Sequence, residues 1–91
     1  MDVEFDAVKD AINQAKHGVS LAFGARVFDD PDAAVFATVR LEDEEERLKA
    51  VGMIDGSLWS AVFVVRQSRT RFISVRRSNT GEQRIYYSNR S

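Results

Sequence analysis

From residue 34 to residue 77 the sequence carries strand-like patterns that are separated only by short turns, with no helical pattern between them. Asp55-Gly56 is a strong hairpin signal, because a type I′ turn needs positive φ at both of its central residues. Gln67-Ser68 forms a second turn, and the acidic stretch Glu42–Glu46 is a polar loop. The predicted strands are Ala34–Val39, Arg47–Met53, Ser57–Val65 and Thr70–Arg77. Strands joined in this way predict a four-stranded antiparallel meander.

Two helices are predicted before these strands. Asp6 is a suitable N-cap and Gly18 a suitable stop for the first helix, whose apolar residues recur at helical spacing. Ser20 caps a second, shorter helix over about 21–28. Pro31 and the acidic residues around it end that helix, because the residue before a proline avoids helical geometry.

A last helix follows the strands. Asn79 and Glu82 form a capping-box pattern, and the helix runs through about Ser88. With Val3–Phe5 as a short extended lead-in, the chain is expected to form one α+β domain over residues 1–91, with its helices covering the apolar face of the sheet. The pattern argues against Rossmann and P-loop folds, because helices do not separate the strands and there is no glycine-rich phosphate loop.

The composition excludes several classes of site. The chain has no cysteine, so disulfides and thiolate metal sites cannot form. The acidic residues at 29–32 and 42–46 have no His or Cys partners and no EF-hand spacing, so no metal site is predicted. No apolar run approaches the ~20 residues that span a bilayer. The first residues do not form a signal peptide, so we expect a cytoplasmic protein without membrane contact.

The net charge of −1 hides a division between the two parts of the chain. Residues 1–55 hold thirteen of the fourteen acidic residues and six basic ones. Residues 56–91 hold seven arginines and a single acid, Glu82. Arginine suits phosphate because its planar fork donates paired hydrogen bonds and keeps its charge. This asymmetry favours nucleic-acid binding, although a solvated sheet face would have the same composition.

The arginine-rich strand carries most of this charge. Strict alternation would put Arg69, Arg71, Ile73 and Val75 on one face and Thr70, Phe72, Ser74 and Arg76 on the other. Aromatic residues among arginines are compatible with base stacking beside phosphate contacts. Alternatively, the apolar residues of this strand belong to the core and the arginines only flank it. Arg47 and Trp59 could line the same sheet, although Trp59 also suits a core position.

Three residues are candidates for proton transfer. Glu82 and Tyr86 lie on the predicted last helix with Arg84, where they could equally serve as the capping acid and as a packing residue. His17 is the only histidine and could shuttle a proton or complement the dipole of the first helix.

Motifs along nearly the whole chain resemble those of the BrnT family of toxin–antitoxin ribonucleases, which have a RelE-like fold. They are Phe5-Asp6, Lys9, Asn13, Ala15–Ser20, Val27–Pro31, Glu46-Arg47, Val51-Gly52, Arg71–Arg77, Glu82, Arg84 and Tyr86. The resemblance implies an RNase that needs no metal or other cofactor and blocks translation. It also implies a BrnA-like antitoxin with a ribbon-helix-helix domain, in a hetero-oligomer that represses its own operon by binding operator DNA.

The sites expected from the motifs and the charge pattern fall into two groups. The expected catalytic residues are His17, Arg76, Glu82 and Tyr86, and the expected RNA-binding residues are Arg47, Arg69, Arg71, Arg77 and Arg84. The chain departs from the family pattern at Phe5, where Trp is usual, and at Thr80-Gly81, where basic residues are usual. The alternative function is therefore a weak or inactive toxin that binds nucleic acid as a corepressor.

Overall fold

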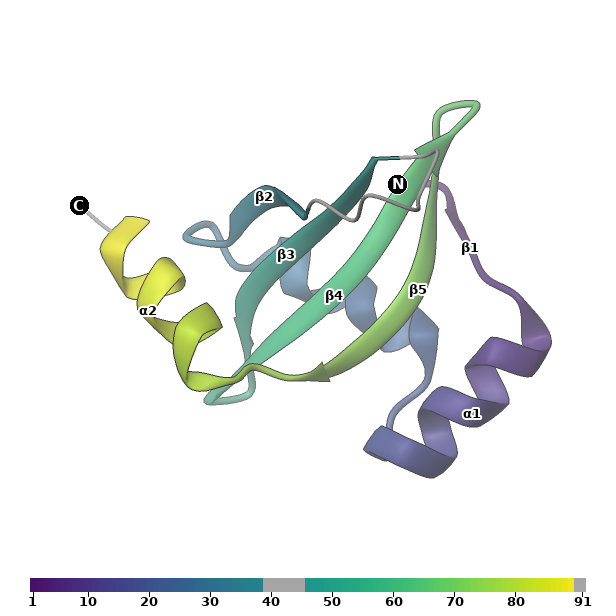
Figure 1. Cartoon of the computed structure of the whole chain (residues 1–91), viewed down its shortest axis with the longest axis horizontal. Coiled ribbons are helices and arrows are strands. Elements are labelled where there is room, and N and C mark those ends of the chain that lie inside the picture. Colours follow the sequence, from purple (N-terminus) through teal and green to yellow (C-terminus); the bar gives the residue numbers. More distant parts are fainter. Residues whose placement is uncertain (39–45, 90–91) are drawn as a thin grey trace.

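The computed structural model describes residues 1–38 and 46–89 and shows one five-stranded sheet with helices on both of its faces (Figure 1). The sheet order is β1-β5-β4-β3-β2. The elements in chain order are β1 (Val3–Glu4), α1 (Ala7–His17), η1 (Leu21–Asp29), β2 (Ala34–Thr38), β3 (Arg47–Ile54), β4 (Ser57–Arg66), β5 (Arg69–Arg77) and α2 (Thr80–Asn89). The α+β class expected from the sequence is confirmed.

The sheet is mixed, so the expected four-stranded antiparallel meander with a RelE-like layout is only partly right. The short lead-in forms β1, which pairs in parallel with β5 at Thr70 and Arg71. The backbone N–H of Thr70 also donates to the carbonyl of Asp2 at 2.7 Å. A strand of two residues is too short to show alternation, and this is why the sequence pattern did not reveal it.

The predicted helix ends are confirmed by their caps. Asp6 accepts a hydrogen bond from the backbone of Lys9, and Gly18 ends α1 with a φ of 79°. Ser20 caps the second helix, which is a 3-10 helix, η1, rather than an α-helix. The last helix opens with a complete capping box, in which Asn79 and Glu82 exchange two hydrogen bonds of 2.9 Å.

The predicted turns are also confirmed. Asp55 and Gly56 both have positive φ, at 48° and 84°, as a type I′ turn requires. Gln67 and Ser68 have φ of 50° and 67° and turn the chain between β4 and β5. The predicted end of the first strand at Val39 and most of the acidic loop, 42–45, lie outside the described residues.

Two hydrophobic clusters lie on opposite faces of the sheet. The larger cluster lies between η1 and the sheet and includes Leu21, Val27, Phe63 and Phe72. The smaller cluster packs α2 against the other face through Val51, Leu58 and Tyr86. The expectation that the helices cover one apolar face is therefore wrong for α2, which covers only part of the second face (Figure 1).

A β-bulge in β5 changes the faces predicted for its residues. Val62 of β4 pairs with Ser74, but the next residue, Phe63, pairs with Phe72, so Ile73 is extra. Phe72 and Val75 consequently both point into the larger cluster. The predicted alternation, which put Arg76 on the face opposite Arg69 and Arg71, is wrong because it assumed an unbroken pleat.

Candidate functional site

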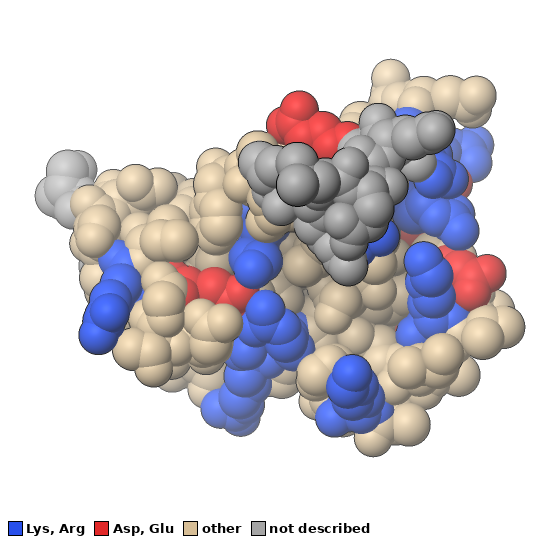
Figure 2. All heavy atoms as spheres, in the orientation of Figure 1, with Lys and Arg blue, Asp and Glu red and all other residues tan. Residues whose placement is uncertain are grey.

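Six of the basic residues that the structure describes share the sheet face that α2 partly covers, which we call the open face. In β4, alternate residues from Leu58 to Arg66 point to this face, and their partners on β3 and β5 point the same way. Strand alternation and register place these basic residues on it: Arg47, Lys49, Arg66, Arg69, Arg71 and Arg76. Figure 2 shows basic side chains spread over this face from the side of α2 to the opposite edge of the sheet.

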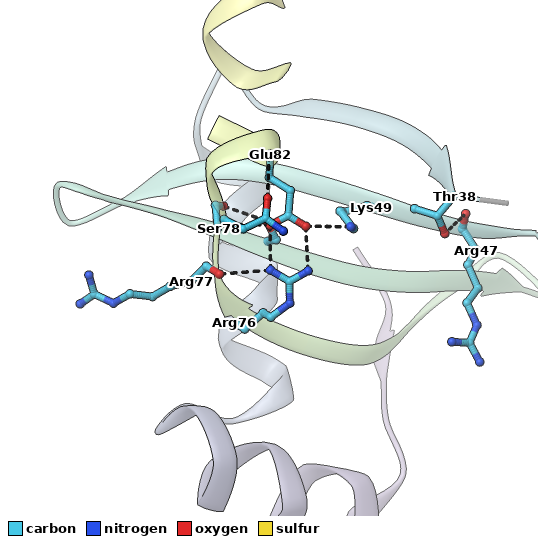
Figure 3. A network of polar contacts seen from close by, with 9 residues as sticks. Thr38, Arg47, Lys49, Arg76, Arg77, Ser78 and Glu82 are labelled. Carbon is cyan, nitrogen blue, oxygen red and sulfur yellow. Dashed lines mark hydrogen bonds and ion pairs between the residues drawn. The ribbon is translucent and has the colours of Figure 1, made fainter. Parts of the chain in front are cut away.

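Glu82 is the centre of a buried polar network at the base of α2 (Figure 3). Its carboxylate accepts two hydrogen bonds of 2.7 Å from Arg76 and one of 2.7 Å from Lys49. Ser60 and the backbone N–H of Asn79 donate to it at 2.9 Å each. Ser60 also shares a 2.7 Å hydrogen bond with Ser78. The network joins α2 to β3, β4 and β5 and fixes two cations on the open face.

The network determines the charge state of its members. Burial alone would raise the pKa of Glu82, but the hydrogen bonds from Arg76, Lys49, Asn79 and Ser60 outweigh it and lower this pKa to about 2. The hydrogen bond to Glu82 raises the pKa of Arg76 further above its ordinary value. Glu82 is therefore an anion at neutral pH, and its oxygens are occupied by cationic and neutral donors.

Arg76 keeps one edge of its guanidinium unused within the described residues. Glu82 and the carbonyl oxygen of Arg77 take three of its N–H groups, all on Nη1 and Nη2. An arginine has five N–H donors, so one on Nε and one on Nη2 remain. These two donors lie parallel on the same edge, which is the arrangement that binds a phosphate with paired hydrogen bonds.

Tyr86 is directed away from this network. Its side chain is 2% exposed, and its hydroxyl donates to Asp30 at 2.6 Å. The same carboxylate oxygen of Asp30 accepts from the backbone N–H of Met53 at 2.8 Å. Asp30 thereby ties the end of η1 to β3 and α2, and Tyr86 is part of a structural contact.

His17 lies at another place, beside a hollow between α1 and the outer edge of β5. The hollow has a volume of about 220 Å³ and is lined by Lys9, Ile12, Asn13, Lys16, His17, Ile73 and Ser74. The buried Asn13 holds α1 there, because its amide bonds both the N–H and the carbonyl of Val75. His17 is half-buried and lines this hollow together with Ser74, which lies on the open face two residues before Arg76.

The expected RNA-binding arginines do not all converge. Arg47, Arg69 and Arg71 share the open face with Arg76, and Glu4 lies 3.7 and 3.6 Å from Arg69 and Arg71. Arg77 pairs with Trp59 and stacks over its ring on the opposite face, 5.3 Å from the ring centroid. Figure 3 shows Arg77 extending away from Glu82. Arg84 is exposed on α2.

Sequence reasoning missed Lys49, Ser60 and Ser78. Lys49 is two residues from Arg47 on one strand, so alternation could have placed both on one face. No sequence signal places Ser60 and Ser78 beside Glu82, because the register and the position of α2 decide that contact.

Two further findings concern metals and membranes. Within residues 1–38 and 46–89, no three His, Cys, Asp or Glu side chains gather closely enough to hold a metal ion. In the same part of the chain, no helix has the length and apolar character needed to cross a bilayer.

The chain matches a known protein family. Residues 5–82 match the model of a family described as the ribonuclease toxin, BrnT, of type II toxin–antitoxin systems. No curated protein matches the chain. The matched segment begins directly after β1 and contains all elements from α1 to β5, and α2 as far as Glu82.

Proposed function

Because the chain belongs to the family of BrnT ribonuclease toxins of type II toxin–antitoxin systems, we propose that it cleaves RNA on its open face without a metal ion and thereby blocks translation. The observation that carries this proposal is the position of Arg76. Glu82 fixes its guanidinium while two parallel N–H donors remain within the described residues. Lys49 donates to the same carboxylate, so a phosphate bound at Arg76 would lie near two cations.

The proposed reaction is internal transesterification. The ribose 2′-hydroxyl gives up its proton to a general base and attacks the adjacent phosphorus. A bond forms between the 2′-oxygen and phosphorus, the bond to the 5′-oxygen of the next nucleotide breaks, and this oxygen takes a proton from solvent water to leave as a hydroxyl. Arg76 and Lys49 stabilise the additional negative charge on the phosphoryl oxygens in the transition state. Preorganised donors of this kind are often the largest contribution to catalysis, because they need no reorganisation during the reaction.

His17 is the best placed of the three candidate groups for proton transfer. Glu82 has a pKa of about 2 and is occupied by five hydrogen bonds, so it suits the role of positioning Arg76. The Tyr86 hydroxyl is buried against Asp30. The imidazole of His17 lines an open hollow and could accept the proton of the 2′-hydroxyl.

The remaining open-face arginines would hold the RNA backbone on either side of the reacting phosphate. Arg47, Arg69 and Arg71 lie along the same face, and their contacts with phosphates would be electrostatic and independent of base sequence. Arg77 and Arg84 stay predictions, because Arg77 lies on the opposite face of the sheet and Arg84 is exposed on α2.

Purified protein with RNA in the presence of EDTA tests the proposal. We expect cleavage that ends in a 2′,3′-cyclic phosphate, and a loss of at least about tenfold in Arg76→Lys, since lysine keeps the charge but lacks the planar fork. Arg77→Lys on the opposite face is the matched control and should cleave as the wild type does. Cleavage that requires added Mg²⁺, or that is unchanged in Arg76→Lys, would contradict the proposal.

The partner of the toxin is a separate proposal. An antitoxin must prevent cleavage, and the simplest way is to cover the open face with acidic groups. We propose a BrnA-like ribbon-helix-helix protein that forms a hetero-oligomer with this chain and binds operator DNA. Charge reversal at Arg71 should weaken its binding, whereas full affinity in that variant would show that the antitoxin docks elsewhere.

A further inference from the structure

The hollow between α1 and β5 lies at the point where β5 loses its strand neighbour. Among the described residues, β1 pairs with β5 only at Thr70 and Arg71. The bulge at Ile73 follows two residues after Arg71. Beyond the bulge, the side chain of Asn13 in α1 hydrogen-bonds the edge of β5 at Val75. The hollow is the space that remains between these two attachments.

The lining of the hollow combines apolar and basic side chains. Ile12 and Ile73 supply apolar surface, while Lys9, Lys16 and His17 supply basic groups. None of its lining residues is acidic. The volume of about 220 Å³ is below the roughly 300–1,000 Å³ of pockets for drug-sized ligands. A ligand that fits has a small, partly apolar body and carries negative charge nearby.

The hollow adjoins the open face at Ser74. Ser74 lines the hollow and also shares the open face with Arg76. Two residues along a strand span about 6.6 Å, so the hollow opens within one nucleotide of the phosphate position at Arg76. A nucleotide held there could place its base against Ile12 and Ile73 with its ribose beside His17.

We propose that the α1–β5 hollow is a nucleobase subsite for a nucleotide that flanks the phosphate at Arg76, an inference that rests on the proposed ribonuclease function. The base is recognised by apolar contact with Ile12 and Ile73 and by polar contacts at its edges. Lys9 and Lys16 attract the adjoining phosphates. The subsite would give the enzyme a preference for unpaired RNA, because a base in a duplex cannot leave its stack without cost.

Binding of a hexamer that cannot be cleaved tests the subsite. The probe is a mixed-sequence 2′-O-methyl hexanucleotide, and its partner probe is the same backbone with all six bases absent. Ile12 is 58% exposed, so Ile12→Ser should fold normally. The matched control is Val8→Ser, one turn earlier on α1, where Val8 is 67% exposed and does not line the hollow.

Fluorescence anisotropy should show about tenfold weaker binding of the base-bearing hexamer by Ile12→Ser, as expected for loss of contact with one base. Binding of the abasic hexamer should be unchanged, and Val8→Ser should match the wild type with both probes. If Ile12→Ser binds and cleaves as the wild type does, the subsite is overturned while the nuclease proposal stands. If the wild type neither binds the hexamer nor cleaves RNA, both proposals are overturned together.

Discussion

Arg76 and Glu82 form a bidentate ion pair in which both N–O distances are 2.7 Å. Glu82 lies at the base of α2, and 5% of its side chain is exposed. The pair joins the last helix to the last strand. It also leaves the second edge of the guanidinium without a partner among the described residues. Glu82 thereby contributes to stability and orients the guanidinium that we propose to bind phosphate.

Replacing Glu82 by Gln should lower the free energy of unfolding by about 3 kcal/mol, because Arg76 and Lys49 lose their shared counter-charge in a largely buried place. Denaturant titration measures this change. Glu4→Gln is the matched control, since Glu4 contacts Arg69 and Arg71 only at 3.7 and 3.6 Å near the surface. It should cost less than about 1 kcal/mol. Equal losses in the two variants would contradict the central role of Glu82.

The ion pair of Arg76 and Glu82 should make the free energy of unfolding depend on pH in the acidic range. The pKa of Glu82 is about 2 in the folded protein and about 4.3 in an unfolded chain. The unfolded state therefore binds more protons below neutrality, and a stabilisation of about 3 kcal/mol is present above pH 5 and lost as the pH falls toward 2. The difference in unfolding free energy between wild type and Glu82→Gln should shrink over this range. A difference that stays constant from pH 7 to pH 2.5 would show that ionisation of Glu82 is not its source.

Local signals accounted for most of the fold. The caps at Asp6, Ser20 and Asn79 and the turn at Asp55-Gly56 are set by hydrogen bonds and φ angles within a few residues, so the sequence could reveal them. The parallel strand β1 depends on a contact nearly seventy residues away in sequence, between Val3 and Thr70. No local pattern encodes such a contact.

The site was predictable only in part for the same reason. The charge asymmetry pointed to β5, and the family motifs pointed to Glu82. One extra residue, Ile73, decides that Arg71 and Arg76 share a face, and strict alternation predicted the reverse. The contact of Lys49 with Glu82 joins β3 to α2 across thirty-three residues and follows from packing rather than from any motif.

His17→Gln should reduce the single-turnover cleavage rate by about 10²–10⁴-fold, the usual contribution of a general base or acid. Its affinity for the 2′-O-methyl hexanucleotide should stay within about threefold of the wild type, because glutamine keeps a polar side chain of similar size. A rate loss that is matched by an equal loss of affinity would assign His17 to binding rather than to proton transfer.

Tyr86→Phe distinguishes a structural from a catalytic tyrosine. The variant loses the 2.6 Å hydrogen bond to Asp30 and leaves a half-buried carboxylate with one donor fewer. We expect an unfolding free energy lower by about 1–3 kcal/mol and an unchanged cleavage rate at a temperature where the variant is fully folded. A large fall in rate in the folded variant would return Tyr86 to the catalytic group.

The open face itself can be tested by the salt dependence of RNA binding with a matched pair of arginines on one strand. Arg71 lies on the open face, whereas Arg77 stacks on Trp59 on the opposite face. Each phosphate contact with single-stranded nucleic acid contributes about 0.7 to the slope of log K against log salt, because a counterion is released on binding. Arg71→Gln should reduce the slope by about that amount and weaken binding at low salt.

Arg77→Gln removes the same charge from the chain but should leave the slope unchanged, since the guanidinium of Arg77 faces away from the bound RNA. If both variants reduce the slope equally, RNA responds to the net charge of the domain, and the open face is not its binding surface.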